Sequence, residues 1–235
     1  ASKAPSFMSE SQISSDGLDL LIPEEQAGRI DVVELNFDFG EGPVSATEVA
    51  IGASVSDVTT KVKDGSDVVF AGKAQKQSKI TFKKSKTQDS SSILRLENTL
   101  NEEVTLQAKK GTTVDLTIAE GKFRRSEVNA GKGKQDDSVT VGSSAKLIDS
   151  EFNLRKGDDT FTVTGGAKLK KTTTVDLGKG GTDTVNIGDG IKGKGKLVVE
   201  NMDGKRDTLT YGGQSFTRQD IEDGVDGLPG NVELG

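Results

Sequence analysis

Asp137–Val141, with the sequence DSVTV, opens a pattern that returns three times toward the C-terminus. The returns are DTFTV at Asp159–Val163, DTVNI at Asp183–Ile187 and DTLTY at Asp207–Tyr211. Successive copies begin 22, 24 and 24 residues apart, and each alternates polar with apolar residues after its Asp. A pattern that repeats every 20 to 50 residues, roughly, indicates that one structural unit is stacked on the next.

A second series of apolar pairs lies between these copies. It comprises Ile80–Phe82, Val104–Leu106, Val128–Ala130, Phe152–Leu154, Val175–Leu177 and Leu197–Val199. Because residues i and i+2 of a strand share one face, the apolar residues of each triplet point inward and the middle residue points outward. A single coil cannot bury its inward face, whereas stacked coils cover one another. The sequence therefore predicts an all-β fold, a single-stranded parallel β-solenoid (β-helix or β-roll) with about 22–24 residues and two short strands per coil.

The composition agrees with a slim interior rather than a compact globule. Only 31% of the 235 residues are hydrophobic and 4% are aromatic, while 29 are Gly. A globular domain of this length normally carries more apolar residues. Turn sequences such as Gly131–Lys134 and Gly178–Gly181 supply the positive backbone φ angles that tight corners need.

The repeats divide the chain into four segments. We expect an extended N-terminal arm over residues 1–30, N-terminal strands and irregular first coils or a cap over 31–64, a regular solenoid over 65–212, and a C-terminal cap and tail over 213–235. Within the last segment, Thr217 followed by Asp220 predicts the start of a short helix. The arm has too few apolar residues to order itself, so we expect it to contact a partner subunit.

Several classes of function are disfavoured by what the chain contains. It has no His and no Cys, which removes the Ser-His and Cys-His catalytic arrangements and thiolate or imidazole metal sites. With no Trp and one Tyr, and with carboxylates scattered through the turns, glycan cleavage is not favoured either, and we expect no enzymatic activity. The net charge is −6 without a basic block, which indicates no nucleic-acid partner. No apolar run is long enough to span a membrane.

One turn-and-strand unit resembles a known calcium-binding repeat. Gly178–Asn186 reads GKGGTDTVN, and Gly157–Phe161 reads GDDTF. These units resemble degenerate repeats-in-toxin sequences, whose nonapeptide is Gly-Gly-x-Gly-x-Asp-x-apolar-x and whose Asp side chains and turn carbonyls bind Ca²⁺. The resemblance implies calcium ligands at Asp158, Asp159, Asp183 and Asp189. The residues themselves favour a plainer alternative without a cofactor, in which the Asp residues begin strands and accept hydrogen bonds from turn amides.

We expect a non-enzymatic structural or assembly protein that is part of an oligomer or larger assembly. Ala1–Pro5 lacks the apolar core of a signal peptide, and the predicted architecture is common in virus particles. A phage virion component, such as a capsid decoration, tail or fibre part, therefore fits best. One alternative is an exported bacterial surface or repeats-in-toxin-like calcium-binding protein, located extracellularly or at the cell surface. A second alternative is a glycan-binding or glycan-cleaving β-helix.

Overall fold

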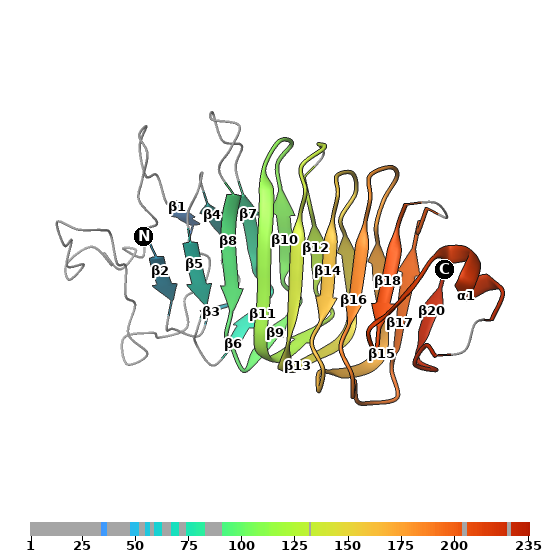
Figure 1. Cartoon of the computed structure of the whole chain (residues 1–235). Helices are drawn as coiled ribbons and strands as arrows, with labels where there is room; N and C mark the ends of the chain where they lie inside the picture. The colour runs from blue at the N-terminus through green and yellow to red at the C-terminus, as the bar shows by residue number, and fades with distance from the viewer. Residues whose placement is uncertain are drawn as a thin grey trace, which may run out of the picture.

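The computed structural model of the chain describes residues 34–36, 48–51, 55–56, 59–62, 67–70, 74–82, 91–131, 133–203, 206–224 and 227–235. The chain is 56% strand and 3% helix and forms a parallel β-solenoid of about 5 turns. Figure 1 shows the strands side by side along one axis, with the chain advancing from one end of the stack to the other. The predicted fold class is confirmed. The predicted arm, residues 1–30, lies outside the described residues.

The strands form three rows, which we name A, B and C in the order in which the chain passes through them. Row A contains β2 (Glu48–Ile51), β5 (Asp67–Phe70), β8 (Ser91–Leu96), the first parts of β11 (Thr113–Arg124) and β13 (Ser138–Asn153), β14 (Thr160–Val163), β16 (Thr184–Ile187) and β18 (Thr208–Tyr211). Within this row Val139, Phe161, Val185 and Leu209 stack in register, all on parallel strands. The repeat that was read from the sequence is therefore a column of core residues.

Row B contains fewer strands than row C, which follows it along the chain. Row B contains β3 (Val55–Ser56), β6 (Ala74–Lys76), β9 (Leu100–Glu102), later parts of β11 and β13, and the first part of β15 (Lys168–Asp176). Row C contains β1 (Glu34–Asn36), β4 (Thr59–Val62), β7 (Lys79–Phe82), β10 (Thr105–Ala108), β12 (Glu127–Asn129), the last parts of β13 and β15, β17 (Lys196–Glu200) and β20 (Val232–Leu234).

Row B corrects the prediction of two strands per coil. Phe123, Leu147 and Leu169 stack in register in this row and are buried. The inward residue two places before each of them is small, namely Gly121, Ala145 or Ala167, and Lys or Arg stands on at least one side of each. The apolar alternation of row B is therefore weaker in the sequence than that of the other two rows.

Row C follows the predicted apolar series with a different register at two coils. Leu106, rather than Val104, pairs with Ile80 and Val128, and Val199, rather than Leu197, pairs with Val175. A shift of two residues leaves the same side chains on the inward face. The alternating pattern therefore gave the buried residues correctly but not their neighbours in the next coil.

The C-terminal end of the stack changes from coils to a hairpin and a helix. β18 pairs antiparallel with β19 (Gln214–Phe216), and α1 (Arg218–Glu222) follows. The predicted N-cap is confirmed, because the Thr217 side chain accepts a hydrogen bond from the Asp220 backbone N–H while the Asp220 carboxylate accepts one from the Thr217 backbone. β20 then joins row C beside β17, so the tail lies against the last coil (Figure 1).

Two glycines in one corner give a matched test of coil packing. Gly178 has φ +84° and Gly180 has φ +80°, so Ala at either position carries left-handed strain of about 1–2 kcal/mol. A Cβ at Gly178 would lie 1.5 Å from the Arg155 carbonyl oxygen in the adjacent coil, whereas a Cβ at Gly180 would meet nothing within 4 Å. We expect the free energy of unfolding of Gly178→Ala to be lower than that of Gly180→Ala by about 1–3 kcal/mol. Urea unfolding followed by circular dichroism measures the difference, and equal stabilities would contradict this coil spacing.

Candidate functional site

The corner between rows C and A holds a column of four buried Asp side chains, Asp137, Asp159, Asp183 and Asp207, each at most 2% exposed. We call it the Asp column. The Oδ1 atom of each accepts a hydrogen bond from a backbone N–H one coil earlier. These bonds run from Val114 to Asp137 (2.7 Å), Asp137 to Asp159 (2.7 Å), Asp159 to Asp183 (2.8 Å) and Asp183 to Asp207 (2.9 Å). Each coil is thus tied to the next through a side chain at this corner.

The same Asp residues also start the strands of row A. Backbone N–H groups of Thr160, Thr184 and Thr208 donate to the carbonyl oxygens of the Asp residues one coil earlier, at 2.9, 2.8 and 2.9 Å. A short carboxylate at a turn is well placed to accept from amides that have no strand partner. The interpretation of these residues as strand starters that bond turn amides is therefore confirmed.

Burial shifts the titration of Asp137, Asp159 and Asp183 in the Asp column. Loss of solvent raises the pKa of Asp137 to about 7, that of Asp159 to about 8 and that of Asp183 to about 6. The charges of Asp137 and Asp183, one on each side, act in the same direction on the pKa of Asp159. The Oδ2 atoms of Asp137 and Asp159 are buried without a hydrogen-bond partner. A proton on that oxygen removes a buried charge, so neutral acid is favoured most strongly at Asp159.

The predicted calcium ligands fall into two places. Asp159 and Asp183 belong to the Asp column, and the exposed Asp158 lies beside them, where its Oδ1 accepts from the Thr182 N–H at 2.8 Å. Asp189 lies in the exposed corner between rows A and B, so row A separates it from the others. Within the described ranges, no group of three or more His, Cys, Asp or Glu side chains is arranged to hold a metal ion. Calcium binding at these residues stays a prediction.

The outer side of the same corner is hollowed into a positively charged groove of about 680 Å³. It is lined by Lys110, Gly111, Gly133, Lys134, Gln135, Arg155 and Lys156, which include four cationic side chains and no acidic one. The Gln135 Oε1 and Arg155 Nε atoms are buried there without hydrogen-bond partners. Such a groove suits a small anionic group. Lys110, Lys134 and Lys156 recur at the coil spacing in the sequence, and this recurrence could have indicated the groove.

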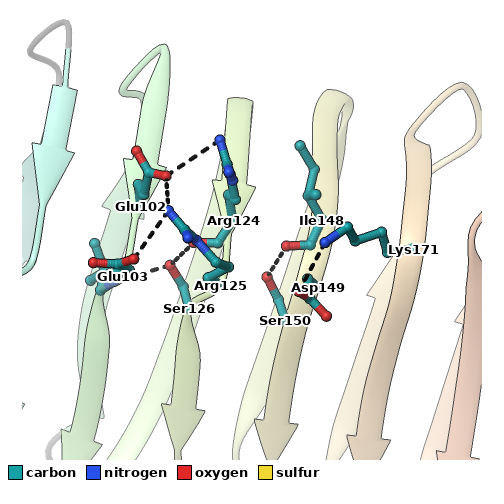
Figure 2. Close-up of polar contacts among 10 residues, drawn as sticks. Glu102, Glu103, Arg124, Arg125, Ser126, Ile148, Asp149, Ser150 and Lys171 are labelled. Atoms are coloured by element: carbon teal, nitrogen blue, oxygen red, sulfur yellow. Dashed lines mark hydrogen bonds and ion pairs between the residues drawn. The ribbon is translucent and has the colours of Figure 1, made fainter.

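At the corner between rows B and C, charged residues of opposite sign alternate from coil to coil, unlike the cationic residues of the groove. Glu103, Arg125, Asp149 and Lys171 occupy it in successive coils with left-handed φ angles between 47° and 63°. Figure 2 shows that their side chains pair along the stack, with Arg125 3.1 Å from the Glu103 carboxylate and Lys171 3.4 Å from that of Asp149. A hydrogen bond from Arg125 also lowers the pKa of Glu102. Exposed pairs contribute little individually, but the alternation of sign avoids repulsion between coils.

No protein-family model matches the chain, and no curated protein or solved structure was matched to it either. No helix in the described part of the chain has the length and apolar character needed to cross a membrane. The functional assignment therefore rests on the geometry of the solenoid.

Proposed function

We propose that this chain is a non-enzymatic structural protein, displayed as a solenoid rod on a phage particle as a capsid decoration, tail or fibre component. One observation carries the proposal: the buried polar groups of the rod bond one coil to the next. The Asp column accepts backbone N–H groups across every step from Val114 to Asp207. A catalytic site instead gathers its titratable groups around a cleft where a substrate can reach them.

The ends of the rod and its arm support an assembled state. Among the described residues, the first and last strands of each row have no further coil on one edge, and such edges are normally covered by a cap or by another chain. At the C-terminal end α1 and β20 occupy this position. We infer that residues 1–30 attach the rod to neighbouring subunits, because a polar arm gains order only from a partner surface.

Purified particles from the producing cells test this function. We expect quantitative mass spectrometry to find the chain at a fixed ratio to the major structural proteins after density-gradient sedimentation. A form that lacks residues 1–30 should fold, as judged by its β circular dichroism, but should not bind particles that have been stripped of the native chain. Recovery of the full chain only in the soluble or secreted fraction would contradict the proposal.

The calcium-binding alternative of an exported, repeats-in-toxin-like protein has one observation in its favour. The buried Oδ2 atoms of Asp137 and Asp159 lack a hydrogen-bond partner and could accept a cation instead of a proton. Under our proposal, millimolar Ca²⁺ leaves the melting temperature unchanged relative to a chelator. A rise of several degrees that is lost in the double variant Asp137→Asn, Asp159→Asn would favour the alternative.

A further inference from the structure

The outward residues of the three rows differ in chemistry. In β14, β16 and β18, row A presents the neutral side chains Thr160, Thr162, Thr184, Asn186, Thr208 and Thr210. From β12 to β17, row C presents several carboxylates and amides, including Glu127, Asn129, Glu151, Asn153, Asp176 and Glu200. From β11 onward, row B presents mostly lysines. Each face therefore offers a different surface to a partner.

The lysines of row B stand in a single line. Lys122 pairs with Lys146, Lys146 pairs with Lys168, and Lys168 pairs with Lys192 through a parallel bridge. We call these four residues the Lys column. Consecutive strands lie about 4.8 Å apart, so the column places one ammonium group per coil in a nearly straight row. Three of the side chains are exposed and that of Lys146 is half-buried.

The fold gives no internal reason for this column. Like charges directly opposite each other on neighbouring strands destabilise a sheet, and their spacing is shorter than the screening length of about 8 Å at physiological salt. In the coil before Lys122 the same position is Leu100, so a neutral residue is accepted there. At the adjacent corner, by contrast, Glu103, Arg125, Asp149 and Lys171 alternate in sign.

Within the described residues, no ion pair joins any of the four ammonium groups of the Lys column to a carboxylate. The acidic residues nearest to the column in sequence are Glu120, Asp149 and Asp189. Asp149 pairs with Lys171 at the next corner, so Glu120, exposed two residues before Lys122 on β11, is the one carboxylate of the three on the same strand face. Lys170, exposed on the same face, adds a further positive charge beside the column.

We propose that the Lys column binds a linear acidic polysaccharide, with one carboxylate or sulfate of the polymer facing each coil. A straight row of equally spaced cations matches a polymer that carries one charge per sugar residue. Release of the counterions condensed on such a polymer gives affinity without an apolar contact.

Two other polyanionic partners fit less well. Single-stranded nucleic acids are bound on aromatic platforms, and the outward residues of row B, which are Lys122, Arg124, Lys146, Ile148, Lys168 and Lys170, include no aromatic side chain. A second copy of this chain could offer the carboxylates of row C. An interface made of charges alone, however, lacks the apolar centre that stable protein interfaces have.

Binding to alginate, a linear polyuronate, tests the proposal on the isolated full-length chain. Neutral dextran and a single-stranded DNA oligonucleotide serve as comparison ligands, and the dissociation constant is measured by biolayer interferometry over a range of salt concentrations. The column variant carries Lys122→Gln, Lys146→Gln, Lys168→Gln and Lys192→Gln. The matched control carries Lys79→Gln, Lys109→Gln, Lys179→Gln and Lys196→Gln, four exposed lysines that belong neither to the Lys column nor to the groove between rows C and A.

We expect the wild-type chain to bind alginate and not dextran, and to bind it more tightly than DNA. The dissociation constant of the column variant for alginate should be higher by about tenfold or more. That of the control, which has the same net charge, should change by less than about threefold. The column variant should also lose most of the salt dependence. Its melting temperature should not fall below that of the wild type, since the substitutions remove repulsion, so weaker binding cannot be attributed to unfolding.

Four results would overturn the proposal: no alginate binding by the wild-type chain, equal weakening in both variants, tighter binding of DNA than of alginate, or a concentration-dependent dimer in sedimentation equilibrium that only the column variant abolishes. The single variant Lys146→Gln provides the same comparison if the quadruple variant does not fold. The test needs no particle, so its outcome is independent of whether the rod belongs to a virion.

Discussion

Replacing Phe152 with Ala is expected to lower the free energy of unfolding by about 3–5 kcal/mol. Phe152 belongs to row C and is fully buried. Its ring centroid lies 5.6 Å from that of Phe123 in row B and 5.0 Å from that of Phe161 in row A. The three rings thus join all three rows at the centre of the interior, and a narrow core has few other side chains that can fill the space left by the ring.

Urea unfolding followed by far-ultraviolet circular dichroism measures this effect. Phe152→Leu keeps most of the buried volume and should cost less than half as much. Val198→Ala, at a half-buried outward position of row C, controls for the removal of apolar atoms outside the core. A loss below about 1 kcal/mol for Phe152→Ala would show that the three rows do not share one packed interior.

The stability of the chain is expected to increase as the pH is lowered from about 8 to about 5. The folded pKa values of Asp137, Asp159 and Asp183 are about 7, 8 and 6, against 3.8 for an Asp carboxyl group in the unfolded chain. Between the unfolded and folded values the folded chain binds more protons, so the free energy of unfolding falls as the pH rises. The stabilisation linked to the protonated forms of these three side chains is fully present below the unfolded pKa. It is lost as the pH rises through the folded pKa values. The change should reach several kcal/mol, because each pKa unit corresponds to about 1.36 kcal/mol.

The acidic neighbours of the Asp column strengthen this dependence. Asp136 adds negative charge near Asp137 and Asp159, while Asp158, Asp203 and Asp207 do so near Asp183. Below about pH 4 the trend should reverse, since the lowered pKa values of Glu102 and Asp220 reflect hydrogen bonds that protonation weakens.

Asp159→Asn isolates the contribution of the column. The amide oxygen can still accept the Asp137 N–H bond, but the side chain cannot ionise. We expect a shallower pH dependence and, at pH 8, a stability equal to or above that of the wild type. The exposed variant Asp189→Asn, at a corner that row A separates from the column, should keep the wild-type pH profile. Melting temperatures between pH 4 and pH 9 provide the measurement, and a stability that rises from pH 5 to pH 8 would contradict the sign of these pKa shifts.

The columns of rows A and C could be predicted from sequence because strand alternation is a local property. Val139 and Val141 reveal their common inward face within five residues, and the recurrence of that pattern at Phe161 and Val185 indicates stacking. Row B was not found in this way, since only small residues, Gly121 and Ala145, accompany Phe123 and Leu147 on the inward face of their segments. The Asp residues were found, but the sequence left open whether they bind calcium or backbone amides.

The sequence by itself determined that the chain alternates inward and outward residues, that this pattern recurs about once per coil, and that an Asp precedes each of the last four strands of row A. Only the tertiary structure decided that there are three rows, that Leu106 rather than Val104 faces Ile80, and that four lysines form one line. The physical reason is that alternation is set within one strand. The neighbours in the next coil depend instead on turn length and on irregularities such as those after Ile118 and Ile148, and these are fixed only when the coils close on one another.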